Sequence, residues 1–223
     1  EEAGKVQIVA LDKTGTITEG KPRITDIKTY AGKEDELLSL AAGMEQGSEH
    51  PLAEAIITYA EEHHIAPTPV ADFKALFGRG IQASIGEKTY YAGNEALMKE
   101  IQVDISPYRA CLDALADEGK TPLIFADKEE IIGIIAAADM EKASSAAAIS
   151  LFEKMGIHVV MLTGDNKRTA EAIRKRLHIP AVIAEVLPQD KEKHIAQLQA
   201  EGHTVAMIGD GINDAPALAK ADL

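Results

Sequence analysis

Several features that would narrow the function of a chain are scarce or missing in this sequence. Among 223 residues there is one cysteine, Cys111, so no disulfide bond can form within the chain and a reducing compartment is favoured. No apolar run approaches the roughly 18 residues that span a bilayer. The longest run, residues 131–138, contains Gly133 and predicts a buried strand. With no signal peptide at its start, we expect a soluble chain, excised from a longer protein because it ends without a closing element.

Basic residues are also fewer than acidic residues. The chain has 23 lysines and arginines against 36 aspartates and glutamates, a net charge of −13. This balance argues against a nucleic-acid partner, because no basic field would attract a phosphate backbone. Any nucleotide site must therefore supply its own local positive charge. A hydrophobic fraction of 46% is sufficient for one large core or two modest ones.

Two segments of the chain alternate strands with helices. Strands are predicted at 5–11, 159–162, 181–184 and 204–208, and helices at 143–155, 166–177 and from Pro188 onward. The helix at 143–155 carries Ala147, Leu151 and Met155 at helical spacing. Strands alternating with helices predict an α/β fold with a parallel sheet covered on both faces.

The stretch between these segments has a different pattern. Helices are predicted at 34–47, 51–64, 94–101 and 106–118, with strands at 70–76, 80–85, 88–92, 121–126 and 131–137. Consecutive strands joined by short turns predict an antiparallel meander. We therefore expect an α+β domain, residues 26–137, inserted into a discontinuous α/β domain formed by residues 1–25 and 138–223.

The most specific motif follows the first strand and reads Asp12-Lys13-Thr14-Gly15-Thr16. It places a carboxylate at the carboxyl end of a buried strand, where ligands bind in open α/β sheets. Such a carboxylate can attack a phosphoryl group and carry it as an aspartyl phosphate. Lys13 supplies positive charge, and Gly15 lets backbone amides approach phosphate oxygens.

Three later strand ends and helix starts also carry polar groups. Thr163-Gly164-Asp165 offers a hydroxyl and backbone amides to phosphate oxygens. Lys191, in the first turn of a helix, can neutralise charge on a transferring phosphoryl group. Asp210 and Asp214, in the string Gly209-Asp210-Gly211-Ile212-Asn213-Asp214, are oxygen donors suited to Mg²⁺.

Nucleophile, hydroxyl, lysine and acidic metal site in this chain order resemble the haloacid dehalogenase superfamily. The full strings, including Pro188-Gln189-Asp190-Lys191 and Asn213-Asp214-Ala215-Pro216, resemble P-type ATPases in particular. The resemblance implies that Asp12 receives the γ-phosphate of ATP. It implies that Lys13 and Thr14 act beside the nucleophile, and that Thr163, Lys191 and Asn213 hold the phosphoryl group. Mg²⁺ is expected on Asp12, the Thr14 carbonyl and Asp210, supported by Asp214.

One position separates a pump from a phosphatase of the same superfamily. Such phosphatases usually carry a second aspartate two residues after the nucleophile, acting as general acid and base. This chain has Thr14 there. Without a positioned carboxylate, water attack on the aspartyl phosphate lacks a base. We therefore expect a persistent phosphorylated intermediate.

The inserted segment contains Ser48-Glu49-His50-Pro51, Gly78-Arg79-Gly80 and Gly93-Asn94. His50 precedes a proline, which predicts an exposed position at a helix start. Together these strings resemble the nucleotide-binding domain of heavy-metal-transporting P-type ATPases. The resemblance implies that adenine and ribose are surrounded by Glu45, His50, Gly78, Gly80 and Asn94, with Gly164 and Asp165 of the other domain as further nucleotide contacts. Asp139-Met140-Glu141-Lys142 looks like the family's Asp-x-x-Lys string near the hinge.

The resemblance implies the ATP-binding and phosphorylation unit of a heavy-metal pump, most similar to copper exporters, with zinc or cadmium left open. ATP and Mg²⁺ are the expected cofactors. The expected partners are the membrane helices and actuator domain of the same pump, and a metallochaperone or metal-binding domain. The full protein is expected at the cytoplasmic face of the cell membrane. Two alternatives remain: a stand-alone phosphatase of the haloacid dehalogenase superfamily, and a non-catalytic nucleotide-binding module.

Overall fold

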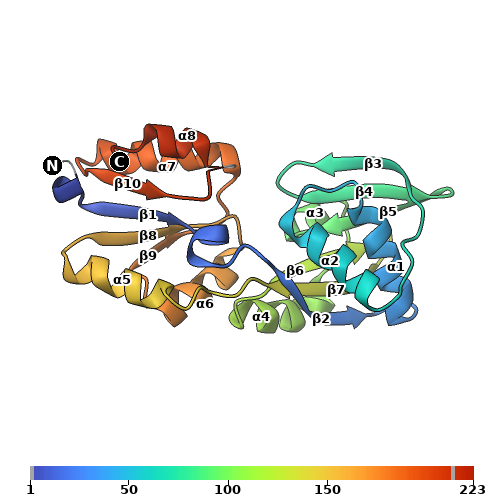
Figure 1. Cartoon of the computed structure of the whole chain (residues 1–223). Coiled ribbons are helices and arrows are strands. Elements are labelled where there is room, and N and C mark those ends of the chain that lie inside the picture. The colour runs from blue at the N-terminus through green and yellow to red at the C-terminus, as the bar shows by residue number, and fades with distance from the viewer. Residues whose placement is uncertain (1–2, 212–213) are drawn as a thin grey trace. The chain divides into compact units, whose positions relative to one another are not determined.

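The computed structural model describes residues 3–211 and 214–223, and the chain divides into two compact units (Figure 1). Unit 1 comprises Glu1–Lys21, Ala116–Gly119 and Asp139–Leu223, and unit 2 comprises Pro22–Leu115 and Lys120–Ala138. Unit 1 is therefore discontinuous in sequence. Its boundaries differ from 1–25 and 138–223, since residues 22–25 and 138 fall in unit 2 and Ala116–Gly119 fall in unit 1.

Unit 1 is built on a four-stranded parallel sheet. Its strands lie in the order β10 (Val205–Ile208), β1 (Ile8–Asp12), β8 (His158–Leu162) and β9 (Ala181–Ile183). All five residues of β1 are buried. A parallel sheet covered on both faces buries both sides of each strand, which explains the continuous apolar run before Asp12. The predicted α/β sheet is confirmed.

Helices cover both faces of this sheet (Figure 1). Helices α5 (Ser145–Lys154) and α6 (Lys167–Leu177) pack against one face through a core that includes Ile149 and Ile173. Helices α7 (Lys191–Ala200) and α8 (Ala215–Lys220) cover the other face through Ile195 and Ala217. The helix predicted to open at Pro188 begins as a short 3-10 turn, Pro188–Asp190, which leads directly into α7.

The apolar stripe of α5 faces away from the sheet. Leu151 is 59% exposed and Met155, the residue that ends the helix, is 63% exposed, whereas Ile149 is 2% exposed. Ala147 is exposed as well. The spacing of these residues predicted an apolar helix face correctly, but that face is not the one that enters the core. The packing face instead contains Ser145, Ile149 and the half-buried Phe152.

Unit 2 contains a six-stranded antiparallel sheet. The strands lie in the order β2 (Arg23–Thr29), β7 (Ile131–Ala138), β6 (Thr121–Ala126), β5 (Lys88–Gly93), β4 (Gly80–Ile85) and β3 (Ala71–Leu76). Strands β3 to β7 agree with the predicted meander. Strand β2 was not predicted. It pairs antiparallel with the buried strand β7, with Arg23 opposite Ala138.

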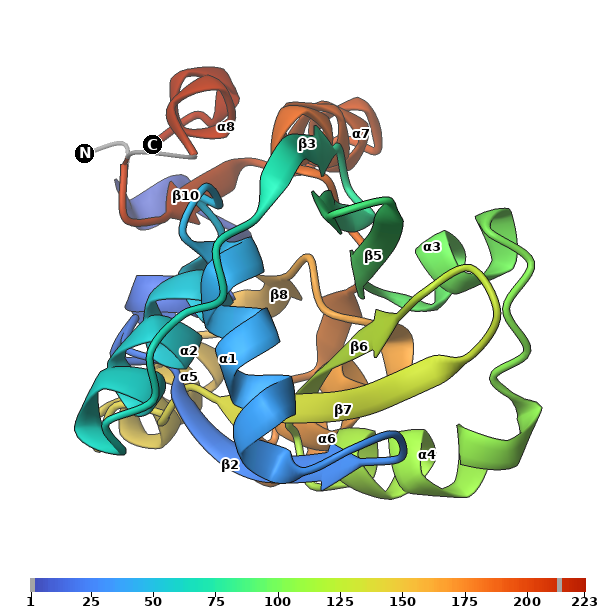
Figure 2. The ribbon, with the colours of Figure 1, turned by 90° about the vertical axis from the view of Figure 1, so that its right-hand side faces the viewer.

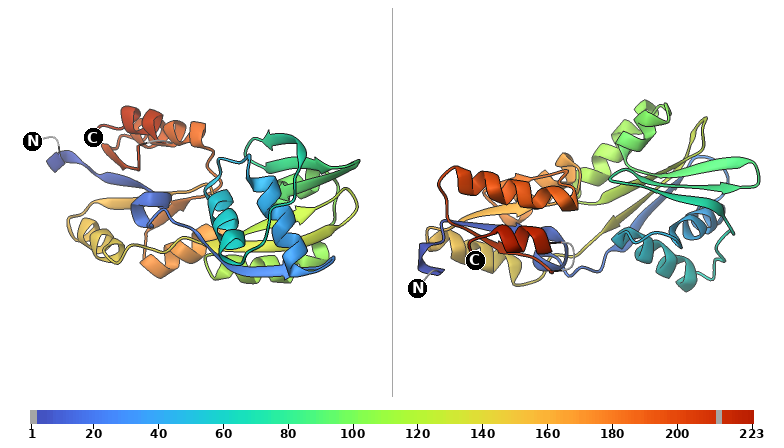
Figure 3. Two further views of the ribbon diagram at one scale, coloured as in Figure 1. Left: turned by 45° about the vertical axis from the view of Figure 1, so that its right-hand side comes forward. Right: turned by 90° about the horizontal axis from the view of Figure 1, so that it is seen from above.

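Helices cover both faces of this second sheet (Figures 2 and 3). Helices α1 (Glu34–Glu45) and α2 (Pro51–Glu62) lie on one face, and α3 (Glu95–Glu100) and α4 (Arg109–Asp117) lie on the other. The predicted α+β insert is therefore confirmed as a fold. Within the described ranges, no helix is both long and apolar enough to cross a membrane.

The orientation of α5 can be tested at two apolar positions of the helix, Ile149 and Leu151. Ile149→Ala removes a buried side chain and should lower the free energy of unfolding by roughly 2–5 kcal/mol. Leu151→Ala removes an exposed side chain and should change it by no more than about 0.5 kcal/mol. Urea unfolding followed by circular dichroism measures both. A larger loss in L151A than in I149A would contradict the orientation described above.

Candidate functional site

Asp12 is the last residue of β1, in the middle of the parallel sheet. It pairs in register with Leu162 of β8, and Leu11 before it pairs with Ile208 of β10. Thr163 follows β8 directly, and Gly209 follows β10. Because the strands are parallel, their carboxyl ends meet at one edge of the sheet. The polar residues predicted at three different strand ends are therefore neighbours.

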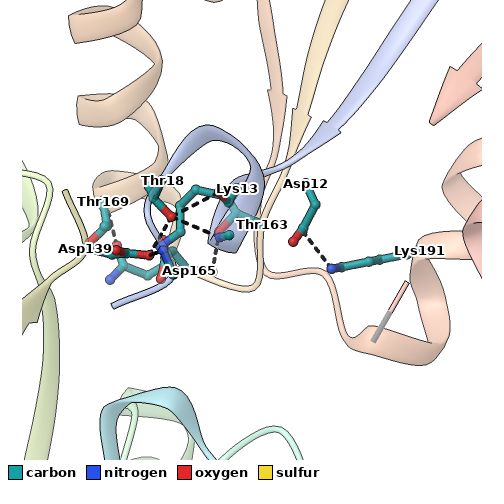
Figure 4. Close-up of polar contacts among 11 residues, drawn as sticks. Asp12, Lys13, Thr18, Asp139, Thr163, Asp165, Thr169 and Lys191 are labelled. Atoms are coloured by element: carbon teal, nitrogen blue, oxygen red, sulfur yellow. Dashed lines mark hydrogen bonds and ion pairs between the residues drawn. The ribbon is translucent and has the colours of Figure 1, made fainter. Parts of the chain in front are cut away.

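Asp12 is buried and ion-paired. Its side chain accepts a hydrogen bond from Lys191, whose Nζ lies 2.7 Å from Asp12 Oδ1 (Figure 4). The same Nζ lies 2.6 Å from Asp214 Oδ1. Asp12 is 5% exposed, Lys191 7% and Asp214 0%. One ammonium therefore lies between two buried carboxylates that come from different segments of the chain.

Burial and charge act in opposite directions on this cluster. Burial raises the pKa of Asp12 above its ordinary value. The hydrogen bond and charge of Lys191 lower this pKa, and the nearby charges of Asp214 and Asp210 raise it, so the net shift is upward. Burial lowers the pKa of Lys191, but the hydrogen bonds to Asp12 and Asp214 outweigh it and the net shift is upward. Lys191 is thus held as a cation beside Asp12.

The turn after Asp12, residues Lys13–Ile17, is irregular, with Gly15 at φ 77°. A residue with a side chain is strained at this angle, so the glycine is required by the backbone. The Gly15 carbonyl accepts a hydrogen bond of 2.7 Å from Lys142 Nζ. Ser145 Oγ donates a 2.7 Å bond to the Ile17 carbonyl. The start of α5 therefore holds this turn in place.

Asp139 fixes the other end of the turn. Its carboxylate accepts hydrogen bonds from the Thr18 hydroxyl at 2.5 Å, the Gly20 amide at 3.1 Å and the Lys21 amide at 3.0 Å. The Asp139-to-Lys142 string was noted for its resemblance to a family motif, and here both its charged ends support the Asp12 turn. Thr18 was not predicted, since its partner is 121 residues away in sequence.

Lys13 and Asp165 form an ion pair, with 2.5 Å between Nζ and Oδ2 (Figure 4). Thr163 is 2% exposed, and its hydroxyl accepts a 3.1 Å hydrogen bond from the Asp165 amide. Gly164 lies exposed between them. The first helical residue is Lys167, capped by Asn166. These groups lie in a turn just before the helix rather than in its first turn.

The acidic string at the end of β10 lies beside the Asp12 turn. Asp210 is exposed, and a side chain at Gly15 would contact it, since an added Cβ would lie 3.6 Å from Asp210 Oδ2. The Asp210 amide donates a 3.3 Å hydrogen bond to Asp214 Oδ2. Asn213 lies outside the described residues. Among residues 3–211 and 214–223, no group of three or more His, Cys, Asp or Glu side chains has the arrangement of a preformed metal site.

In unit 2, Glu45 and His50 lie at the end of α1 and the start of α2. Glu45 is 3% exposed, and burial raises its pKa to about 7, although a hydrogen bond from Ser48 lowers it. His50 is exposed at the N-cap of α2, as predicted, and its Nδ1 accepts a 3.2 Å hydrogen bond from the Leu52 amide. The imidazole orientation is therefore fixed by the helix that it caps.

Gly78 and Gly80 lie at the tightly packed turn between β3 and β4, and Asn94, which follows β5, is hydrogen-bonded to this turn. The Asn94 side chain donates a 2.9 Å hydrogen bond to the Gly78 carbonyl and accepts a 3.1 Å bond from the Leu97 amide. Gly80 has φ 145°, and a Cβ there would lie 2.1 Å from the Ala92 carbonyl oxygen. Backbone packing alone thus requires glycine at position 80. Asn94 caps α3 and holds the turn between β3 and β4.

A cavity in unit 2 lies away from these residues. It has a volume of about 290 Å³ and is lined in part by Leu37, Lys88, Tyr90 and Asp127. None of the residues predicted to bind nucleotide lines it. The predicted nucleotide contacts therefore do not line this cavity.

With this geometry established, residues 6–222 match the haloacid dehalogenase-like hydrolase family, and the chain belongs to that family. A copper-exporting P-type ATPase of Staphylococcus haemolyticus (strain JCSC1435) is 46% identical over 223 residues, covering 100% of this chain and 28% of the relative. The chain thus spans little more than a quarter of that curated relative.

Two solved structures are also similar. The catalytic domain of the CPx-ATPase CopB-B, which changes conformation upon nucleotide binding, has a TM-score of 0.77 at 27% identity and matches 100% of this chain and 78% of that one. A zinc-transporting PIB-type ATPase in its E2.Pi state has a TM-score of 0.62 at 38% identity and matches 99% of this chain and 36% of that one.

The shifted pKa of Glu45 predicts how stability depends on pH. Between 4.5 and about 7 the folded state keeps the Glu45 proton that the unfolded state has lost, so stability falls as pH rises through this window. The loss is up to about 3 kcal/mol above pH 7. Glu45→Gln removes this pH-dependent loss of stability. The melting temperature of E45Q relative to that of wild type should therefore be higher at pH 8 than at pH 5.

Glu49→Gln is the matched control, because Glu49 is an exposed carboxylate in the same connection between α1 and α2. Its melting curves should follow wild type across the pH range. Differential scanning calorimetry at both pH values provides the comparison. A constant difference between E45Q and wild type would show that Glu45 does not retain its proton on folding.

Proposed function

We propose that this chain is the ATP-binding and phosphorylation unit of a copper-exporting P-type ATPase. The observation that carries the proposal is the buried Asp12 carboxylate, at the end of a central parallel strand and hydrogen-bonded to the Lys191 ammonium. The similarity to a copper exporter at 46% identity supports copper over zinc, since the zinc-transporting structure is 38% identical. Both values come from relatives longer than this chain.

In the proposed reaction an Asp12 carboxylate oxygen attacks the γ-phosphorus of ATP. A bond forms between Asp12 and phosphorus, the bond from phosphorus to the bridging oxygen breaks, and ADP leaves with that electron pair. Lys191, 2.7 Å from Asp12, favours the ionised nucleophile and then offsets charge on the phosphoryl oxygens. Thr163 and Asn213 are proposed to donate hydrogen bonds to those oxygens. Lys13 is held by Asp165 at the same edge of the sheet.

The donor set at this edge fits Mg²⁺. Asp210 and Asp214 both raise the pKa of Asp12, so three carboxylates act on one another with a single lysine among them. Oxygen donors with excess negative charge suit a hard divalent cation. When bound, Mg²⁺ supplies positive charge against the phosphate oxygens. We assign Asp12, the Thr14 carbonyl and Asp210 as its ligands, with Asp214 holding Lys191 and the Asp210 amide in position.

The phosphorylated state is proposed to persist. Position 14 is threonine, so the turn lacks the carboxylate that activates water in related phosphatases. The Asp214 carboxylate is tied to Lys191 and to the Asp210 amide. With threonine instead of a carboxylate at position 14, hydrolysis of the acyl phosphate is proposed to be slow. A long-lived phosphoenzyme gives a pump time to change conformation.

Unit 2 is proposed to hold the nucleotide. Since His50 Nδ1 accepts the Leu52 amide, the neutral imidazole carries its proton on Nε2 and can donate to, or stack on, adenine. Glu45 is proposed to accept from the adenine amino group. The turn of Gly78 and Gly80, held by Asn94, is proposed to lie against the ribose, with Gly164 and Asp165 of unit 1 as further nucleotide contacts.

The rest of the pump polypeptide is the proposed partner, since this chain covers 28% of its copper-exporting relative. In the whole protein, phosphorylation of Asp12 is proposed to drive copper through membrane helices outside this chain. The chain is then placed at the cytoplasmic face of the cell membrane. A metallochaperone or metal-binding domain is proposed to deliver the cargo ion.

Asp12→Asn tests the phosphoryl acceptor. The chain is incubated with Mg²⁺ and γ-³²P-labelled ATP, quenched in acid, and treated with hydroxylamine, which cleaves acyl phosphates. Wild type should carry a hydroxylamine-labile label. D12N should carry none, because the amide nitrogen and oxygen are poor nucleophiles.

Asp35→Asn, an exposed carboxylate at the start of α1, is the control and should be labelled like wild type. Labelling that survives in D12N would show that a residue other than Asp12 accepts the phosphoryl group. A wild-type chain without label under saturating ATP would refute its activity as an isolated unit.

His50→Gln tests the adenine contact. It should weaken ATP binding by about five- to twelvefold, since one hydrogen bond to the base is worth roughly 1–1.5 kcal/mol, and leave Mg²⁺ and phosphate binding unchanged. His64→Gln is the matched control, because His64 is an exposed histidine at the other end of α2. Isothermal titration calorimetry measures each affinity. Equal ATP affinities for H50Q and H64Q would show that His50 does not contact the nucleotide.

A further inference from the structure

The turn between β3 and β4 carries one basic side chain, Arg79, between Gly78 and Gly80. Its backbone is fixed: the Arg79 amide donates to the Leu76 carbonyl at 2.9 Å, and its carbonyl accepts from the Asn94 amide at 2.9 Å. A Cβ at Gly93 would lie 2.2 Å from the Arg79 carbonyl oxygen. Arg79 is thus anchored against the end of β5 through its backbone, and the position of its side chain is set separately.

The Arg79 guanidinium is paired with the Glu100 carboxylate, at the end of α3. Both side chains are about half exposed, at 46% and 49%. An ion pair this accessible to water contributes little to stability. A doubly or triply charged phosphate chain can therefore displace Glu100, and the planar guanidinium suits phosphate oxygens.

The predicted nucleotide site lacks a lysine or arginine of its own, and Arg79 is a basic residue in the same turn. Glu45, His50, Gly78, Gly80 and Asn94 provide one carboxylate and no lysine or arginine. The whole chain carries a net charge of −13. A nucleotide with several phosphate charges would meet repulsion there unless a cation lies close by. Arg79 occupies the same turn as two of these residues.

We propose that Arg79 is the phosphate contact of the unit 2 site and gives it preference for phosphorylated nucleotides over adenosine. The guanidinium leaves Glu100 when the nucleotide binds, and Glu100 competes with the phosphate chain for it. This inference rests on the proposed nucleotide-binding function of unit 2. It adds a specificity residue that the adenine contacts do not provide.

The test compares ATP and adenosine binding to the 223-residue chain by NMR titration at low and moderate salt. Arg79→Met should lower ATP affinity about fivefold or more and change adenosine affinity less than twofold. Glu100→Gln should raise ATP affinity about two- to threefold, because the competing carboxylate is gone. The double variant should bind ATP as R79M does. The salt dependence of ATP binding should be shallower in R79M than in wild type.

Arg109→Met is the matched control. Arg109 pairs with Glu95 at the other end of α3, with similar exposure of 45% and 48%, so it repeats the loss of an exposed ion pair without altering the turn. It should bind both ligands as wild type does. Unchanged ATP affinity in R79M, or an equal loss of ATP and adenosine, would overturn the role of Arg79 while leaving nucleotide binding standing. A wild-type chain that binds neither ligand would overturn nucleotide binding itself, and Arg79 with it.

Discussion

The Lys191 ammonium, placed between the carboxylates of Asp12 and Asp214, is the interaction on which the site in unit 1 depends. The three groups come from the end of β1, the start of α7 and the residue before α8. Two carboxylates buried this deeply repel each other, and a shared cation makes their burial tolerable. The same cation holds Asp12, the proposed nucleophile, and in the proposed reaction it would offset charge on the phosphoryl group. Stability and proposed chemistry therefore rest on one side chain.

A second constraint explains how unit 1 tolerates a large insertion. The turn after Asp12 is held by Asp139, Lys142 and Ser145, on the segment that returns from unit 2. This turn is therefore complete only when both segments of unit 1 meet. Unit 2 uses backbone in a comparable way, since Asn94 and close packing at Gly80 fix the turn that carries Arg79. In both units, hydrogen bonds to main-chain groups fix the turns that carry side chains proposed to act.

Much of the fold followed from local pattern. The apolar run before Asp12 and the strand–helix alternation predicted the parallel sheet, and the short-turn strands of the insert predicted the meander. Two features did not follow. Strand β2 alternates exposed and half-buried residues and is defined by pairing with β7, more than a hundred residues later in the chain. The stripe of Leu151 and Met155 has the spacing of a core face, yet the helix packs through Ile149, because the sheet and α6 decide which side is covered.

The sequence by itself determined the class of fold and predicted candidate site residues, because motifs such as Asp12-Lys13-Thr14-Gly15-Thr16 combine a strand end, a turn and reactive groups within a few residues. Only the tertiary structure decided how these residues are partnered. It paired Lys191 with both Asp12 and Asp214, Lys13 with Asp165, Thr18 with Asp139, and Arg79 with Glu100. Most of these partners are far apart in sequence, and burial and ion pairing act through space, so no local pattern encodes them.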